Sequence, residues 1–241
     1  MGLKIGNLSL NRFVRGMIGT RLIDPIEVYY LVDEDVFYPI ISKSGCSSIK
    51  LNLIRKYNPD FTSKFPEIHQ VDPALETNGK VIRQYFYNFK TYRAFSNNKK
   101  ACLVIRNPYE RIYSCFLDVE KGKNVMFEDP SGLTNFFGIT TGISFEKFLK
   151  KVIKLPDYLS DRHFRSQSFY LQNGVKETLS DLEIILLEHY NKKEDEVLRL
   201  NTNNKKIPLE ILQSLQTNRA FQKRFYMDLQ LYNAAKEDVS S

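Results

Sequence analysis

Two segments far apart in this chain share one pattern: a run of β-branched and apolar residues, a short turn with a basic side chain and hydroxyls, and the start of an amphipathic helix. The first segment spans 38–49 and the second spans 102–114. At such a junction the N–H groups of the first helical turn and the positive end of the helix dipole point to one place, which suits an anion. Two such junctions predict a ligand that carries phosphates at both ends.

The first segment predicts a strand followed by a helix. Val36–Ile41 is rich in β-branched and aromatic residues and follows the acidic turn 33–35, which favours a strand. After Gly45 the apolar residues recur at helical spacing. The apolar face holds Ile49, Leu53 and Ile54, whereas Lys50, Asn52 and Arg55 are expected off that face.

The turn of the first segment carries groups that suit a phosphate. Gly45 permits a positive φ or a close backbone approach, Ser47 or Ser48 is expected to cap the helix, and Lys43 places an ammonium beside the N–H groups. The spacing of the nucleotide triphosphate P-loop is absent, because Lys43 precedes Gly45. An ordinary strand–loop–helix with an exposed lysine is the alternative for this segment.

The second segment repeats this order. Ala101–Ile105 predicts a central strand that ends at Arg106, and Pro108 fits the first turn of a helix. Arg111 and Ser114 are neighbours on the surface of that helix. A guanidinium and a hydroxyl together suit a phosphate, and a solvated helix face is the alternative.

As a pair, the two segments resemble sulfotransferases that use 3′-phosphoadenosine-5′-phosphosulfate (PAPS). The stretch 42–48, Ser-Lys-Ser-Gly-Cys-Ser-Ser, is similar to their 5′-phosphosulfate loop, Pro-Lys-Ser-Gly-Thr-Thr-Trp. The stretch 105–114 is similar to the 3′-phosphate motif of the carbohydrate branch, Val-Arg-Asp-Pro-Tyr-x-Arg-Leu-x-Ser. Cys46 and Ser47 replace threonines, Ser48 replaces Trp and Asn107 replaces Asp.

Weaker similarities to the same family follow along the chain. The stretch 161–167 resembles the Asp-x-His-Trp-x-Pro-Gln segment of carbohydrate sulfotransferases, and 225–232 resembles their C-terminal Tyr-x-x-Asp-Tyr-x-x-Phe signature. Leu182–Glu188 resembles their late strand ending in Glu, with a helix expected over Lys192–Leu200. The pieces 58–61 and 67–69 are similar to His-Pro-Asp-Val and Glu-Val-His in glucosaminyl 3-O-sulfotransferases.

The resemblance implies a role for each matched residue. The loop that binds the 5′-phosphosulfate would be formed by Ser42, Lys43, Ser44, Gly45, Cys46, Ser47 and Ser48, and Lys43 would meet the charge that develops on the leaving phosphate. Arg106, Arg111 and Ser114 would hold the 3′-phosphate. The base that takes the acceptor proton would be Glu67, His69 or His163, with Glu67 favoured because the Glu of the similar Glu-Val-His piece is the base.

Bulk properties fit an α/β enzyme and limit the other classes. No apolar run long enough for a transmembrane helix occurs, and the chain is similar to a catalytic domain without the membrane anchor that animal relatives usually carry. The three cysteines lack metal-ligand spacing, which predicts no metal and a reducing, cytoplasmic setting. Cys102 and Cys115 are expected to be buried. The net charge of +7 suits an anionic ligand or an acidic polymer.

We therefore expect one sulfotransferase domain over 1–241, with its core at about 36–232, built on a P-loop-like α/β fold in which a central parallel sheet has helices on both faces. Residues 1–25 are expected to form a peripheral lead-in, and 124–143 a long loop. Helices are expected over Phe145–Val152 and Leu209–Leu215.

The expected activity is transfer of the sulfuryl group of PAPS, without a metal, to a hydroxyl of a carbohydrate, which includes acidic polysaccharides. A lipid or small-molecule alcohol is the alternative acceptor. Three other functions stay open: a kinase-like nucleotide-dependent transferase, a homologue that binds the nucleotide without catalysis, and a basic nucleic-acid-binding protein. The last is disfavoured because no nucleic-acid module is recognisable.

Overall fold

A computed structural model describes residues 4–5, 8–9, 22–64, 66–121, 138–193 and 206–240. The described residues divide into two compact units. The sheet unit comprises Ile26–Arg106, Tyr170–Lys205 and Tyr232–Ser241, and the helical unit comprises Met1–Pro25, Asn107–Phe169 and Lys206–Leu231. The prediction of one domain over the whole chain stays a prediction.

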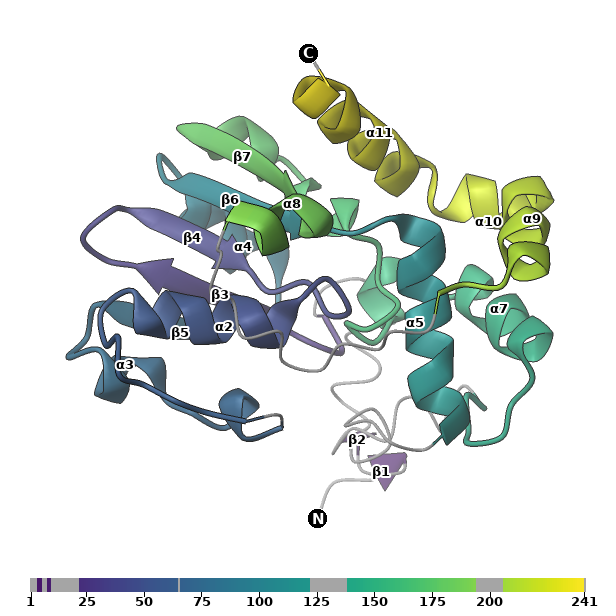
Figure 1. Cartoon of the computed structure of the whole chain (residues 1–241), viewed down its shortest axis with the longest axis horizontal. Coiled ribbons are helices and arrows are strands. Elements are labelled where there is room, and N and C mark those ends of the chain that lie inside the picture. The colour runs from purple at the N-terminus through teal and green to yellow at the C-terminus, as the bar shows by residue number, and fades with distance from the viewer. Residues whose placement is uncertain are drawn as a thin grey trace. The chain divides into compact units, whose positions relative to one another are not determined.

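The sheet unit contains a five-stranded sheet in the order β5-β3-β4-β6-β7 (Figure 1). Its strands are β3 (Ile26–Leu31), β4 (Val36–Pro39), β5 (Val81–Phe86), β6 (Lys100–Ile105) and β7 (Asp181–Leu186). The pairs β4–β6 and β6–β7 are parallel, whereas β3 is antiparallel to both β4 and β5. All strands except β3 thus point the same way, and the α/β fold with a mostly parallel core is confirmed.

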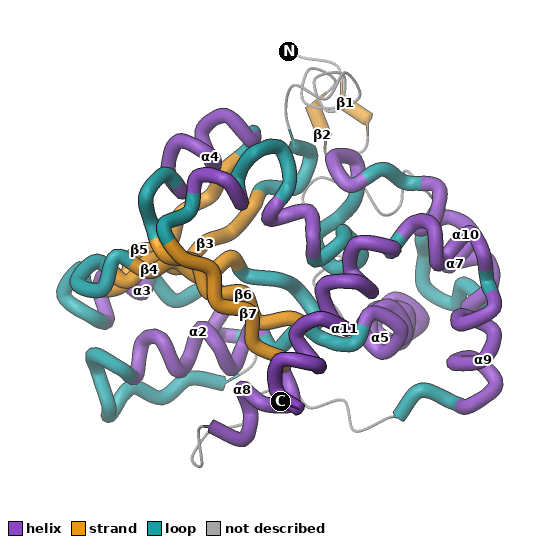
Figure 2. The backbone as a smooth tube through the Cα atoms, turned by 90° about the horizontal axis from the view of Figure 1, so that it is seen from above, coloured by secondary structure: helices purple, strands orange, loops and turns teal. Residues whose placement is uncertain are grey.

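Helices cover both faces of this sheet, as predicted. Figure 2 shows α4 (Phe89–Ser96) on one side of the strands, with α2 (Cys46–Arg55) and α8 (Leu187–Lys193) on the other. Alternate residues of the strands face the two layers, because successive strand side chains point to opposite faces. Tyr29 and Leu31 pack with Ile49 and Leu53 of α2, while Tyr30 and Phe37 meet the ring of Phe95 in α4.

Shorter elements complete the sheet unit. The one-turn helix η1 (Glu67–His69) and α3 (Pro73–Glu76) lie between α2 and β5, and η4 (Lys176–Thr178) precedes β7. The 3-10 helix η3 (Ser168–Leu171) runs across the unit boundary, as does α11 (Tyr226–Ser240). The predicted strand ending at Glu188 stops instead at Leu186, so Glu188 lies in the first turn of α8, where its Oε1 accepts a hydrogen bond from the Tyr232 hydroxyl at 2.8 Å.

The helical unit is built around an aromatic core. Its main helices are α5 (Pro108–Lys121), α7 (Phe145–Lys154), α9 (Leu209–Thr217) and α10 (Arg219–Arg224), and the short η2 (Asp157–Leu159) follows α7. The short strands β1 (Lys4–Ile5) and β2 (Leu8–Ser9) pair antiparallel. Phe116, Phe148, Phe221 and Phe225 are buried in one cluster, and this burial accounts for the apolar periodicity of the helices.

Several sequence expectations are confirmed by these elements. The helices predicted at 145–152 and 209–215 are α7 and α9, Pro108 begins α5, and Cys102 and Cys115 are buried. Most of the predicted lead-in 1–25, most of the predicted loop 124–143 and the predicted helix beyond residue 193 lie outside the described residues. In the described part of the chain, no helix has the length and apolarity needed to cross a membrane.

Candidate active site

The turn between β4 and α2 has a backbone that only a few residue types adopt easily. Gly45 has φ 78° and Lys43 has φ 66°, so both lie in the left-handed region. A Cβ at Gly45 would lie 2.5 Å from Cδ1 of Leu187, the first residue of α8. Gly45 therefore has the positive φ that the sequence allowed for, and α8 leaves little space for a side chain there. Lys43 is strained, as non-glycine residues in this region often are at functional sites.

The start of α2 is not capped by a side chain from the described residues. Its N-cap is Gly45, and Cys46 is the first helical residue. The prediction that Ser47 or Ser48 caps the helix is wrong, because these residues lie two and three positions past the cap, inside the first turn. The N–H groups of a first turn have no acceptor within the helix, and Gly45 offers no side-chain oxygen to them. The predicted anion site at this helix start thus keeps its backbone donors.

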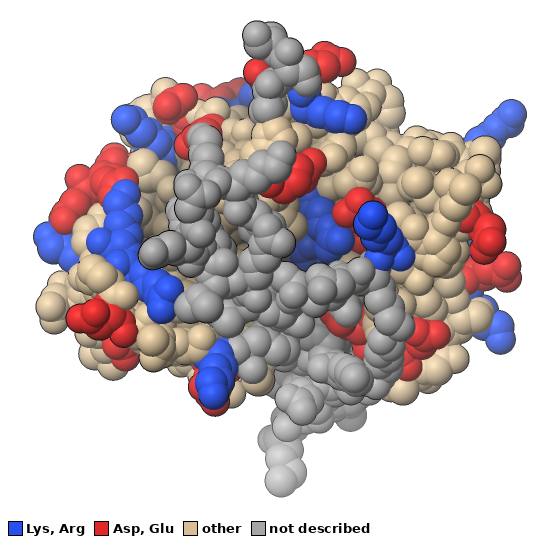
Figure 3. Space-filling model, viewed as in Figure 1, with Lys and Arg blue, Asp and Glu red and all other residues tan. Residues whose placement is uncertain are grey.

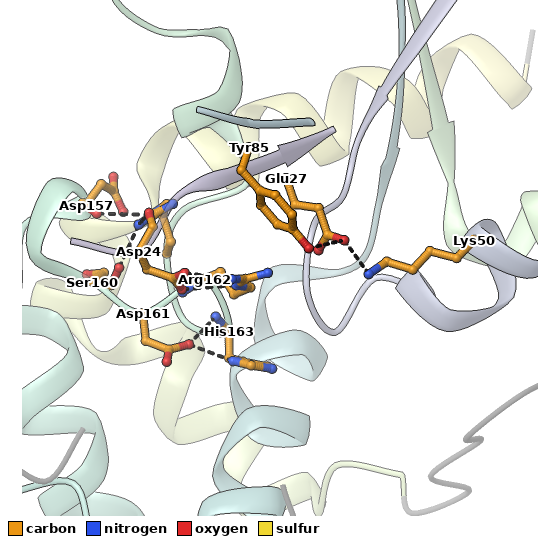
Figure 4. A network of polar contacts seen from close by, with 10 residues as sticks. Asp24, Glu27, Lys50, Tyr85, Asp157, Ser160, Asp161, Arg162 and His163 are labelled. Carbon is orange, nitrogen blue, oxygen red and sulfur yellow. Dashed lines mark hydrogen bonds and ion pairs between the residues drawn. The ribbon is translucent and has the colours of Figure 1, made fainter. Parts of the chain in front are cut away.

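Ser47 belongs to a chain of polar side chains in contact that was not predicted from the sequence. Its Oγ lies 3.0 Å from Nε2 of His69, and Nδ1 of His69 lies 3.2 Å from Nζ of Lys50. Nζ of Lys50 in turn donates to Oε1 of Glu27 at 2.6 Å. Tyr85 also reaches this carboxylate, with its hydroxyl 3.4 Å from Oε1. Figure 4 shows Glu27 between Tyr85 and Lys50.

The position of Lys50 corrects an expectation. Lys50 was placed off the apolar face of its helix, yet only 2% of it is exposed, and Glu27 is 3% exposed. The ammonium also lies 5.5 Å from the ring centre of Tyr29. A charged side chain can be buried in this way when an opposite charge and hydrogen bonds compensate it. The available signals were Glu27 inside an otherwise apolar strand and Lys50 three positions after Ser47.

The predicted bases of the sheet unit differ in their surroundings. Glu67 begins η1 and is exposed. His69 ends the same turn, its backbone carbonyl accepts a hydrogen bond from Arg83 at 3.0 Å, and both of its ring nitrogens have polar partners. The polar partners of His69 distinguish it from the exposed carboxylate of Glu67, and the assignment of either residue as the base stays a prediction.

Arg106 and Asn107 form the junction between β6 and α5. Nη1 of Arg106 lies 3.5 Å from the carbonyl oxygen of Lys43, at the outer limit of a hydrogen bond, so the two predicted cations belong to one part of the sheet unit. The side-chain oxygen of Asn107 accepts from the N–H groups of Tyr109 and Glu110 at 3.0 and 3.4 Å. Asn107 is therefore an N-cap, a role that Asp and Asn fill equally well, which explains this departure from the family pattern.

Arg111 and Ser114 lie in α5, in the helical unit. Arg111 is only 1% exposed and donates from Nη2 to the carbonyl of Arg162 at 3.2 Å. The Asp228 carboxylate is also near: burial raises the pKa of Asp228, opposed by the positive charge of Arg111 and by backbone N–H donors. These partners give Arg111 a structural task within its unit. Ser114 is 6% exposed.

His163 is oriented by a carboxylate within the helical unit. Its Nδ1 lies 2.6 Å from Oδ1 of Asp161, which also accepts the backbone N–H of His163 at 2.8 Å (Figure 4). Burial opposes ionisation of Asp161, but the charge and hydrogen bonds of His163 outweigh it, so the pKa of Asp161 is lowered. With Nδ1–H bonded to the carboxylate, Nε2 is the nitrogen that can accept a proton, which is the arrangement of an oriented general base.

Surface charge by itself does not locate a site. On the face seen in Figure 3, Lys and Arg side chains lie interspersed with Asp and Glu. Among the described residues, no group of three or more His, Cys, Asp or Glu side chains is arranged to hold a metal ion. The candidate site therefore depends on the local geometry around Lys43–Ser48.

A mostly parallel sheet with a glycine-bearing turn before a helix is the architecture that α/β proteins use to bind phosphate groups. The model of the sulfotransferase family matches residues 29–200, from β3 to beyond α8. The chain therefore belongs to the sulfotransferase family, whose members transfer sulfuryl groups. Searches of curated proteins and of solved structures found no match.

Proposed function

We propose that this sulfotransferase moves the sulfuryl group of PAPS to a hydroxyl of a carbohydrate, and that the 5′-phosphosulfate binds at the start of α2. The observation that carries the proposal is the turn at Lys43–Gly45, with its left-handed glycine and a helix start whose cap is Gly45 rather than a polar side chain. The helix end, the N–H groups of its first turn and Lys43 supply positive charge and donors without any metal.

The reaction requires one bond to break as another forms. The acceptor oxygen attacks sulfur in line with the leaving 5′-phosphate oxygen, the S–O bond to that phosphate breaks, and 3′,5′-adenosine bisphosphate leaves with the bonding electrons. Lys43 would stabilise the charge that develops on this phosphate. Arg106, Ser114 and, less favourably because of its burial, Arg111 are the residues proposed for the 3′-phosphate.

The acceptor proton goes to a base, and we assign that role to Glu67. It lies in the same unit as Lys43, is exposed to an incoming acceptor, and is not part of the buried chain that occupies His69. Glu67→Gln should keep bisphosphate binding and lose turnover by about a hundredfold or more, as loss of general base catalysis does. If Glu67→Gln turns over normally while His163→Gln does not, the base is His163.

The net charge and the buried cysteines support an acceptor class and a compartment. A net charge of +7 favours an acidic polysaccharide among carbohydrates. The buried thiols of Cys102 and Cys115 fit a reducing compartment, so the cytoplasm is the proposed location.

The first test is a thermal shift with 3′,5′-adenosine bisphosphate, with AMP and ATP–Mg²⁺ as controls. Ligand at about 100 times its dissociation constant stabilises by roughly 2.7 kcal/mol, which raises the Tm of a domain of this size by roughly 5–10 °C. A shift specific to the bisphosphate supports the two-phosphate site. A shift with ATP–Mg²⁺ alone would indicate a kinase-like transferase, and no shift with any nucleotide would refute the proposal.

The second test is sulfuryl transfer from radiolabelled PAPS to a panel of polysaccharides. Lys43→Met should abolish transfer in a folded protein, while Lys56→Met, a change of the exposed lysine at the other end of α2, should not alter it. Bisphosphate binding without any transfer to any acceptor would identify a homologue that binds the nucleotide without catalysis.

A further inference from the structure

Lys50 and Glu27 form an ion pair that is shielded from water inside the sheet unit. The side chains are 2% and 4% exposed, and the distance from Nζ to Oε1 is 2.6 Å. Burying two charges costs so much hydration that such a pair adds little net stability compared with apolar side chains. The main effect of this pair is therefore to orient the remaining N–H groups of the Lys50 ammonium.

The ammonium determines which nitrogen of His69 carries the proton. A lysine ammonium has three N–H donors and no acceptor, so Nδ1 of His69, at 3.2 Å from Nζ, must accept. A neutral imidazole has a single N–H, which is then on Nε2. A doubly protonated ring would turn a second N–H toward the ammonium, and the like charges disfavour that form.

The proton on Nε2 in turn orients the hydroxyl of Ser47. Nε2–H donates to Oγ of Ser47 at 3.0 Å, so the hydroxyl directs its own proton elsewhere. Ser47 lies in the first turn of α2, beside the N–H groups that face an anion. With the opposite tautomer, Ser47 would donate into His69 and present only oxygen lone pairs to the anion, which would repel a phosphate.

We propose that Glu27, Lys50 and His69 form a positioning chain that makes the Ser47 hydroxyl a hydrogen-bond donor to the phosphosulfate at the start of α2. This inference rests on the proposed function, because it requires an anion at that place. None of the three residues is assigned contact with the reacting atoms; they act through Ser47.

The tautomer of His69 is measurable without any ligand. The chain has three histidines, so long-range ¹H–¹⁵N spectra of the labelled full chain are simple, and the signals of His69 are those that disappear in His69→Gln. At about pH 8 the expected result is a neutral ring with the proton on Nε2. A ring protonated on Nδ1, or an imidazolium, would overturn the inference even if the bisphosphate binds.

Binding of 3′,5′-adenosine bisphosphate tests whether His69 acts through Ser47. In Gln the acceptor oxygen and the donor nitrogen of the amide are separated by one carbon, as the two nitrogens of imidazole are. The His69→Gln variant should therefore bind the bisphosphate within about threefold of the wild-type affinity. His69→Leu and Ser47→Ala should each lose roughly tenfold or more, the loss expected for a hydrogen bond to a charged group. The double variant Ser47→Ala/His69→Leu should bind no worse than Ser47→Ala, and additive losses would overturn the positioning role.

A double substitution tests the ion pair itself without leaving one charge buried alone. Glu27→Gln/Lys50→Met should give His69 a mixture of both tautomers and bind the bisphosphate roughly tenfold more weakly. The matched control is Glu34→Gln/Lys56→Met, because that pair is exposed, with 37% and 48% of the two side chains accessible. Unchanged tautomer and affinity in the Glu27/Lys50 variant would overturn the proposal. If the wild type binds no bisphosphate, the proposed function fails, whereas the tautomer experiment still decides the Glu27–Lys50–His69 geometry.

Discussion

Replacing Gly45 by alanine tests the geometry of the turn most directly. Gly45 has φ 78°, and an added Cβ would lie 2.5 Å from Cδ1 and 3.8 Å from Cγ of Leu187. Two costs follow: the left-handed backbone conformation of a non-glycine residue, and the overlap with α8. The first is about 1–2 kcal/mol, and overpacking adds about 1 kcal/mol, the low end of its usual cost, because the contacted atom is the end of a flexible side chain.

Gly79 offers a matched control for the first cost. It has the same φ of 78°, lies in the same unit, and a Cβ there would meet no atom within 4 Å among the described residues. Gly79→Ala should therefore lose only about 1–2 kcal/mol of unfolding free energy, and Gly45→Ala should lose about 1 kcal/mol or more beyond that. The measurement is urea denaturation followed by circular dichroism.

The excess loss at Gly45 should depend on Leu187. Because the nearest atom is the end of a flexible side chain, Leu187→Ala should remove most of the excess in the double variant, which gives a coupling energy of roughly 1 kcal/mol or more. Equal losses at Gly45 and Gly79, or no coupling to Leu187, would refute the inference that this turn is closely packed against α8.

Two further predictions concern other predicted motifs. Asn107→Ala should cost about 0.5–2 kcal/mol of unfolding free energy because α5 loses its cap, whereas Asn107→Asp should be nearly neutral; equal losses in chemical denaturation would contradict the capping role. The lowered pKa of Asp161 means that its ionised form stabilises the fold above the unfolded pKa of about 3.9, and that this stability is lost as the pH falls through the folded pKa. His163→Gln should thus be less stable than the wild type near pH 6, with a difference that shrinks as the pH falls below about 3.9 and through the folded pKa of Asp161, and a pH-independent difference would rule out this linkage.

Local sequence patterns predicted the parts of the fold that depend on local physics. The strand–turn–helix order at α2 and α5, the positive φ of Gly45 and the start of α5 at Pro108 all depend on neighbouring residues, and all were correct. The predicted cap of α2 was wrong: serine is a good cap in general, but here the N-cap is Gly45, two residues before Ser47 and three before Ser48.

The elements that sequence reasoning missed depend on distant partners. β3 was not predicted as a strand, although Ile26–Leu31 has the composition of one. The antiparallel pairing of β3 with β5 is also long-range and leaves no local signal. Lys50 was expected to be exposed because helical periodicity treats every lysine as solvated. The burial of Lys50 is explained largely by Glu27, a residue distant in the sequence, and their pairing joins β3 to α2.

The same pairing limits what Lys50 can contribute to anion binding. Together Glu27 and Lys50 carry no net charge, and the field of such a pair falls off faster with distance than the field of a single ammonium. Lys50 therefore adds little positive potential at the start of α2, where Lys43 and the helix end provide it. The buried pair instead orients the Ser47 hydroxyl through His69. Nζ of Lys50 lies 3.2 Å from Nδ1 of His69, and Nε2 of His69 lies 3.0 Å from Oγ of Ser47. A hydrogen bond depends steeply on angle and distance, so this chain can select the orientation of one hydroxyl where an added charge would only strengthen attraction for any anion.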